Sequence, residues 1–322
     1  MQAVKQFLPS LNRERIFRNL LSFVPASLIR QIFIFSGVLG VICCQTACAE
    51  NQPPINLHLV YTSNLNGALD DCRCGGNPVG GMNRVLPVLD SLRSAHPDML
   101  LLDGGDFLMS YTLPEANRVM LNLMAIAGYD ALNLGDQEFV ESADFIREVS
   151  DQSKLDLKVL SANLDAGSRQ TFHQYDIFEK ADVKIAVAGL VMPEAFEFIL
   201  VDDLTVSPVI EAMNQISTEM TADSDIQIVL FHGSWEAAKA VSQQFPWIDV
   251  IILAHNQQKK FVADGEIAFA ECGTEGQYIG YLQIQKNEGR WEFKNQFIAI
   301  NDDLLFSPTA QEMVDGYYKS LE

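Results

Sequence analysis

Blocks of apolar and polar residues alternate along most of the chain, and their spacing predicts strands and helices in turn. Strands are predicted at residues 55–63, 98–105, 130–135, 157–164, 226–233 and 249–256, with a hairpin at 175–191. Helices are predicted at residues 82–96, 114–128, 142–151, 207–222, 234–245 and from 307 onward. Short strands dominate after residue 260, at 266–273, 278–285 and 291–300. This order predicts an α/β protein with two packed sheets and helices on their outer faces.

The first 49 residues have the pattern of an export signal. A basic segment ends at Arg30, an apolar core spans residues 32–44, and "ACA" at 47–49 is a small-x-small cleavage pattern. The apolar core is shorter than the roughly 20 residues that cross a bilayer. We therefore predict a signal over residues 1–49 and an exported protein, periplasmic or extracellular. Lipidation at Cys48 and an uncleaved membrane anchor are the alternatives, although "QTAC" lacks the aliphatic residue of a typical lipoprotein signal.

The rest of the chain is strongly acidic. After residue 49 it has 17 Lys and Arg against 41 Asp and Glu, a formal charge of −24. Such a surface repels nucleic acids and anionic membranes, so neither is expected as a partner beyond an N-terminal anchor. Any chemistry on an anion needs a local cation in the site.

Polar side chains follow the ends of several predicted strands. They are Asn64, Asn66, Asp103, Asp106, Asp136, Gln137, Glu138, His232, His255 and Gln257. Each one alone is typical of a turn or a loop cap. In open α/β sheets, however, strand ends meet at one edge, where ligands bind. Carboxylates and imidazoles brought together there would suit Zn²⁺, Mn²⁺ or Fe.

These motifs, in this order, resemble the calcineurin-like metallophosphoesterase superfamily, in particular the catalytic domain of the 5′-nucleotidase/2′,3′-cyclic phosphodiesterase family. The matching segments are "NLNG", "GGMNR", "LLLDGGDF", "GYDALNLGDQEF", "SANL", "FHGS", "AHNQ" and "GTEGQYIG". The resemblance implies a four-layer αββα sandwich of two mixed sheets, over residues 50–303. It also implies a C-terminal helix over 304–322, without the nucleotide-specificity domain that follows in the family.

The resemblance carries metal-binding roles to single positions of this sequence. One ion of the family is held by an Asp, an Asn and two His, and the matching residues here are Asp106, Asp136, His232 and His255. All four side chains have ligand atoms, and Asp136 replaces an amide with a carboxylate. The resemblance therefore implies one intact site for a divalent Zn, Mn or Fe ion.

The other half of the family's site has changed. Asn64 and Asn66 stand where the family has Asp and His, and Gln257 matches its last metal ligand. The family's catalytic His falls at Gln137, and the Asp that orients it falls at Val140. Because two-metal hydrolysis uses both ions, we expect weak or absent hydrolysis of a small phosphorylated molecule. A non-catalytic binding protein is an alternative.

Three cysteines follow the signal region, namely Cys72, Cys74 and Cys272. Cys72 and Cys74 form a Cys-x-Cys motif just after the altered "NLNG" segment. One interpretation is a disulfide from one of the pair to Cys272. A second is a thiol redox protein with a redox partner, in which Cys72 and Cys74 react and Cys272 resolves. Metal binding by the thiols is the third.

Overall fold

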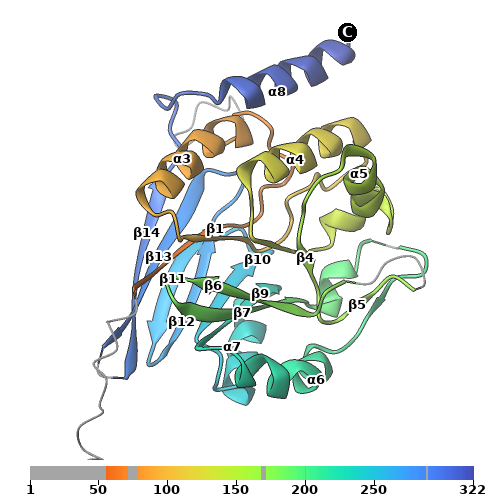
Figure 1. The fold of residues 1–322 in the computed structure, drawn as a ribbon. Coiled ribbons are helices and arrows are strands. Elements are labelled where there is room, and N and C mark those ends of the chain that lie inside the picture. The colour runs from red at the N-terminus through yellow and green to blue at the C-terminus, as the bar shows by residue number, and fades with distance from the viewer. Residues whose placement is uncertain (1–55, 72–78, 168–171, 200, 288) are drawn as a thin grey trace, which may run out of the picture. The chain divides into compact units, whose positions relative to one another are not determined.

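The computed structural model describes residues 56–71, 79–167, 172–199, 201–287 and 289–322 (Figure 1). All of them belong to one compact unit that ends at Glu322. The predicted signal region, Cys72 and Cys74 lie outside the described residues. In the described ranges, no helix combines the length and apolar composition needed to cross a bilayer.

The first sheet has six strands in the order β14-β13-β1-β2-β3-β4. Their bounds are β1 (Asn56–Thr62), β2 (Leu100–Asp103), β3 (Ala131–Asn133), β4 (Val159–Leu160), β13 (Tyr278–Asn287) and β14 (Arg290–Ala299). β1 to β4 are parallel, with Leu59 opposite Leu100 in the first pair. β13 is antiparallel to both β1 and β14. The sheet is therefore mixed, and its parallel strands end on one edge.

The second sheet also has six strands, in the order β11-β12-β10-β9-β7-β6. Their bounds are β6 (Tyr175–Lys180), β7 (Val183–Val191), β9 (Ile226–His232), β10 (Val250–Ala254), β11 (Lys259–Asp264) and β12 (Ile267–Cys272). The four central strands are parallel, and the two edge strands are antiparallel to their neighbours. β9 ends at His232 and β10 leads into His255, so this sheet also presents polar groups at its carboxyl edge.

Alternation of apolar side chains along the strands packs the two sheets together. Leu57, Leu59 and Tyr61 of β1 share a buried cluster with Ile228 and Leu230 of β9. The intervening residues of these strands face away from that cluster, into the helices. Successive side chains of a strand point to opposite faces of the sheet. A strand that is buried on both sides therefore needs apolar residues on both faces.

Helices cover both outer faces. Their bounds are α3 (Met82–Ala95), α4 (Pro114–Ala127), α5 (Phe145–Ser153), α6 (Val209–Ala222), α7 (Trp235–Gln244) and α8 (Pro308–Ser320), with short 3₁₀ turns η2 (Gln137–Phe139) and η3 (Pro193–Phe196). α3, α4 and α5 pack on the first sheet, α8 packs across α3 and α4, and α6 and α7 pack on the second sheet (Figure 1). The predicted αββα sandwich of two mixed sheets is confirmed.

Two segments differ from the prediction. Residues 157–164 form two short strands, because after β4 the chain leaves the first sheet and β5 (Leu164–Asp165) pairs with β8 (Thr205–Val206). The buried Asn163 side chain lies at this break and donates to Val191 O (2.7 Å) and Ser207 O (2.9 Å). β11 was not predicted, since its half-exposed edge position tolerates the polar sequence "KKFVAD".

Candidate metal centre

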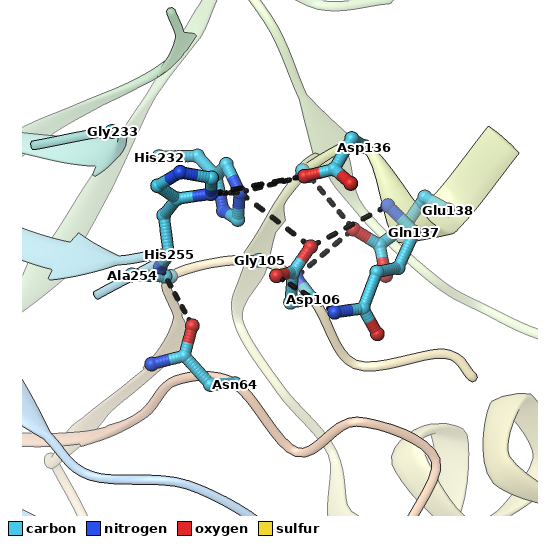
Figure 2. A network of polar contacts seen from close by, with 12 residues as sticks. Asn64, Gly105, Asp106, Asp136, Gln137, Glu138, His232, Gly233, Ala254 and His255 are labelled. Carbon is cyan, nitrogen blue, oxygen red and sulfur yellow. Dashed lines mark hydrogen bonds and ion pairs between the residues drawn. The ribbon is translucent and has the colours of Figure 1, made fainter. Parts of the chain in front are cut away.

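Four predicted residues come together where the two sheets present their carboxyl edges (Figure 2). Asp106 follows β2, Asp136 follows β3, His232 ends β9 and His255 follows β10. Each offers one ligand atom, and these atoms all lie within 4.8 Å of one another. The side chain of His232 is fully buried, whereas that of His255 is 43% exposed, so the cluster is open on one side.

The ligand atoms converge on a common centre. His232 Nε2 lies 3.2 Å from Asp136 Oδ1 and 3.5 Å from Asp106 Oδ1. His255 Nδ1 lies 3.2 Å from His232 Nε2. Two carboxylates and two imidazoles are a donor set that suits Zn²⁺, Mn²⁺ or Fe. These four residues therefore fit one divalent ion.

Left-handed backbone conformations bring the side chains into this cluster. Asp106 has φ 59° and His255 has φ 90°, a region that non-glycine residues rarely adopt. Gly135 has no room for a side chain, since a Cβ there would lie 2.4 Å from Asp106 Oδ1. Strained backbone of this kind is concentrated at functional sites, where surrounding contacts maintain it.

Glu138 holds the Asp106 loop in place, a role that the sequence analysis missed. Its buried carboxylate accepts backbone N–H groups from Asp106 (3.0 Å), Phe107 (2.9 Å), Leu108 (3.0 Å) and Gly135 (2.7 Å). Burial, assisted by Asp106, raises the pKa of Glu138 to about 7 despite these hydrogen bonds. One sign of this role is present in the sequence, namely an acidic residue directly before an aromatic residue, Phe139, which is buried in the structure.

The carboxylates also change the protonation of the cluster. Burial alone lowers the pKa of His232, but Asp106, Asp136 and Glu138 outweigh it and raise the pKa to about 9. Burial raises the pKa of Asp106 to about 6. His255 has a lowered pKa, through burial and the neighbouring His232. Binding of a cation here would compete with the proton on His232.

Hydrogen bonds occupy the side chains of the altered half-site. Asn64 Oδ1 accepts the backbone N–H of His255 at 2.6 Å (Figure 2). Gln137 Nε2 donates to Asn66 Oδ1 at 3.1 Å and to Asp106 Oδ2 at 3.0 Å. The side-chain oxygens of Asn64 and Asn66, and Oδ2 of Asp106, which is shared between the two half-sites, therefore all accept protein N–H groups.

These contacts do not fit a second ion. Asn64 Nδ2 donates to Glu271 Oε1 (3.1 Å) and to Gly273 O (2.9 Å), so both ends of this amide are in use. Gln257, the last predicted ligand, is exposed at the rim of a cavity that Gln137 also lines. The side-chain amides of Asn66 and Gln137 are thus hydrogen-bonded to each other directly beside Asp106.

Cys272 ends β12 as a buried, free thiol. Its Sγ lies 3.3 Å from Ser63 Oγ, and burial raises its pKa to about 12. An attacking thiol needs its thiolate form, which this environment disfavours. The disulfide and redox predictions for Cys72 and Cys74 lie outside the described residues.

Solved structures share this fold. A 5′-nucleotidase precursor from Thermus thermophilus superposes with a TM-score of 0.74 and 19% identity, over 83% of this chain and 59% of that one. Calcineurin-like phosphoesterase YfkN from Bacillus subtilis superposes with a TM-score of 0.67 and 19% identity, over 83% of this chain and 98% of that one. The chain therefore has the fold of these two proteins.

Sequence comparison finds 5′-nucleotidases among the relatives of this chain. The enzyme from Bos taurus is 23% identical over 279 residues, which are 73% of this chain and 47% of that protein. The human 5′-nucleotidase is 22% identical over 277 residues, 72% of this chain and 47% of that one. No family model matches the chain. The chain spans about half the length of the curated 5′-nucleotidases it matches, and the predicted resemblance to this family is confirmed.

Proposed function

We propose that this chain is a metal-dependent phosphoric ester hydrolase that works with a single divalent ion. Asp106, Asp136, His232 and His255 would hold that ion, within a metallophosphoesterase-like domain over residues 50–303. The observation that carries the proposal is the asymmetry of the site. Four ligand atoms lie within 4.8 Å of one another, while the side-chain oxygens of Asn64 and Asn66 in the other half-site accept protein N–H groups.

A divalent ion in this site would supply a Lewis acid for a phosphoryl oxygen and lower the pKa of a bound water. The chain itself supplies charge and shape. Asp106 and Asp136 bring the negative charge that retains a cation, and Glu138 fixes the Asp106 loop. Gln137 donates hydrogen bonds but has no proton to transfer to a leaving group. Turnover should therefore be slower than in a site with two ions and a catalytic acid.

The test combines metal analysis with turnover of an activated ester. We expect about one Zn, Mn or Fe ion per purified chain, and metal-dependent release of p-nitrophenol from p-nitrophenyl phosphate. His255→Ala should lose both, while His173→Ala, an exposed histidine outside the cluster, should keep both. Purified protein that binds no metal after incubation with all three ions would refute the proposal. One bound ion without turnover would instead favour the non-catalytic binding protein.

The thiol redox alternative makes a different prediction in the same experiment. Replacing Cys72 and Cys74 with Ser should leave metal content and ester hydrolysis unchanged if hydrolysis is the function. A disulfide reductase activity lost in that variant would support the redox alternative. The buried position and raised pKa of Cys272 do not favour it as the resolving thiol.

We also propose that the chain is exported and acts on a small phosphorylated molecule outside the cytoplasm. The basic and apolar order of residues 1–49 supports export, and the acidic surface argues against nucleic acid as a partner. Mass spectrometry of the mature N-terminus distinguishes cleavage after Ala49 from lipidation at Cys48. A full-length chain recovered from the cytoplasm would refute export.

A further inference from the structure

The four candidate ligands are divided equally between the two sheets. Asp106 and Asp136 follow strands of the first sheet, whereas His232 and His255 lie at strand ends of the second. The position of one sheet edge relative to the other therefore sets the distances within the cluster. A contact that joins the two edges would hold both pairs of ligands at the spacing that one ion needs.

Asn64 forms such a contact. It lies just after β1 of the first sheet, and it is fully buried. Its Oδ1 accepts the backbone N–H of His255 at 2.6 Å (Figure 2). Its Nδ2 donates to Glu271 Oε1 at 3.1 Å and to Gly273 O at 2.9 Å. All three partners belong to strand ends of the second sheet, so this one amide joins the two carboxyl edges.

Glu271 determines which way the Asn64 amide points. A carboxylate only accepts hydrogen bonds, so the NH₂ group of Asn64 has to face Glu271 and the amide oxygen has to face His255. An amide turned by half a rotation would bring N–H groups against N–H, and oxygen against oxygen. A carboxylate at position 64 would likewise face that of Glu271 across the same 3.1 Å.

The Glu271 side chain is itself held from a second direction. It is fully buried, and its Oε2 accepts the indole N–H of Trp235 in α7 at 2.8 Å. Lys260 is opposite Glu271 in the ladder between β11 and β12, and its Nζ lies 4.1 Å from the centroid of the Trp235 ring. A buried carboxylate is tolerated when its oxygens accept hydrogen bonds in this way.

The backbone of His255 is the part of the metal centre that this arrangement reaches. Its φ of 90° is in the left-handed region, which a residue other than glycine keeps only when its surroundings maintain it. The same residue places Nδ1 3.2 Å from His232 Nε2 in the cluster. The bond from His255 N–H to Asn64 Oδ1 therefore holds both a strained backbone and a candidate ligand.

We propose that Glu271 is a positioning residue of the metal centre and that it acts through Asn64 on the backbone of His255. Its carboxylate fixes the orientation of the Asn64 amide, and Asn64 in turn joins the two sheet edges and holds His255 in place. The proposal rests on the proposed function, because it concerns the assembly of the same ion site.

Amide hydrogen exchange in the metal-free chain, followed by NMR, tests the first step. Glu271→Gln keeps the shape of the side chain but turns an NH₂ group toward Asn64 or Trp235, which are both donors. We expect the His255 amide to exchange ~10-fold faster in this variant, relative to the amide of Ile252 in the buried strand β10. Glu266→Gln makes the same change at an exposed residue just before β12 and should leave this ratio unchanged.

A reciprocal exchange separates orientation from packing. Asn64→Asp alone sets two carboxylates face to face, whereas Asn64→Asp combined with Glu271→Gln again pairs a carboxylate with an amide. The double variant should recover most of the protection of the His255 amide, although Gly273 O loses its donor. Unchanged His255 exchange in Glu271→Gln, or a double variant no better protected than Glu271→Gln, would overturn the proposal.

Metal affinity tests the second step. We expect Glu271→Gln to bind Zn²⁺ ~10-fold more weakly than the wild type, and Glu266→Gln to bind it equally well, as measured by competition with a chromophoric chelator. Equal Kd values for the wild type and Glu271→Gln would overturn the link to the metal centre. A wild-type chain that binds no ion would refute the proposed function, while the exchange rates of the metal-free chain still decide the role of Glu271 in holding His255.

Discussion

At the scale of single residues, the exchange that most affects chemistry is the amide at Gln137. Its Nε2 donates to Asp106 Oδ2 at 3.0 Å, so it stabilises a carboxylate but cannot protonate a leaving group. An ester with a weakly basic leaving group needs little protonation, whereas one with a more basic leaving group depends on it. The rate should therefore fall steeply as the leaving group becomes more basic.

Gln137→His restores a titratable group at this position. We expect it to raise the ratio of phenyl phosphate to p-nitrophenyl phosphate turnover by ~10-fold, below the usual range for general acid catalysis, because Val140 cannot orient the imidazole. The measurement is kcat for both esters, with the metal content of each preparation as the control. An unchanged ratio at equal metal content would show that the position does not limit proton transfer.

Cys272 gives a second prediction at this scale. Its sulfur is buried and its pKa is raised to about 12, so the native thiol should not react with iodoacetamide at mildly alkaline pH. Peptide mapping by mass spectrometry should find this residue unlabelled in the native chain and labelled in urea. Rapid labelling in the native chain would show that the sulfur reaches solvent.

At the scale of strands and loops, sequence patterns predicted which strand ends meet in the candidate metal centre. Asp106, Asp136, His232 and His255 each follow an apolar run, and the parallel strands bring them to adjoining sheet edges. The position of such a strand along the chain can be predicted because its burial leaves a periodic pattern of apolar residues in the local sequence.

Side-chain contacts within the site could not be predicted in the same way. The bond from Gln137 to Asn66 joins residues 71 positions apart and depends on rotamers that packing selects. Apolar patterning predicts one strand through Asn163, yet its buried amide donates to two backbone carbonyl groups where β4 and β5 are separated. Long-range polar pairing of this kind leaves no periodic trace in the sequence.

A carboxylate between two strands gives the next prediction. Asp249 precedes β10, and its Oδ2 accepts the N–H of Gln227 in β9 at 2.8 Å. Burial raises its pKa from 3.8 to about 6, so the native state holds this proton more tightly than the unfolded chain does. The stabilisation from this group is therefore full below about pH 4 and disappears as the pH rises through about 6.

Asp249→Asn keeps an acceptor for Gln227 and removes the titration. We expect the loss of unfolding free energy between about pH 4 and pH 6 to be smaller in the variant, by ~1–3 kcal/mol. Urea denaturation at several pH values measures the unfolding free energy of both proteins. The difference between the wild type and the variant reports Asp249 alone, because the other buried carboxylates are the same in both. Parallel pH profiles for the two proteins would contradict the assignment.

At the scale of the whole molecule, the balance of charge favours a bound cation. The chain has a formal charge of −20, and Asp106 and Asp136 meet in the cluster, where burial, and with it Asp136, raises the pKa of Asp106. An ion bound there would offset the repulsion between these two carboxylates in the folded state. A ligand that binds only the native state stabilises it by about 2.7 kcal/mol at a free concentration of 100 times its Kd.

Stabilisation of that size should raise Tm by ~5–10 °C for a domain of this length. We expect Zn²⁺ or Mn²⁺ to produce this shift in differential scanning calorimetry, and EDTA to reverse it. His255→Ala removes a ligand that is 43% exposed at little cost to packing, so its metal-free Tm should stay near the wild-type value while the metal-dependent shift disappears. His173→Ala should retain the full shift. An equal shift in the His255 variant would mean that the cation stabilises the chain through its acidic surface, because general screening does not require these four ligands.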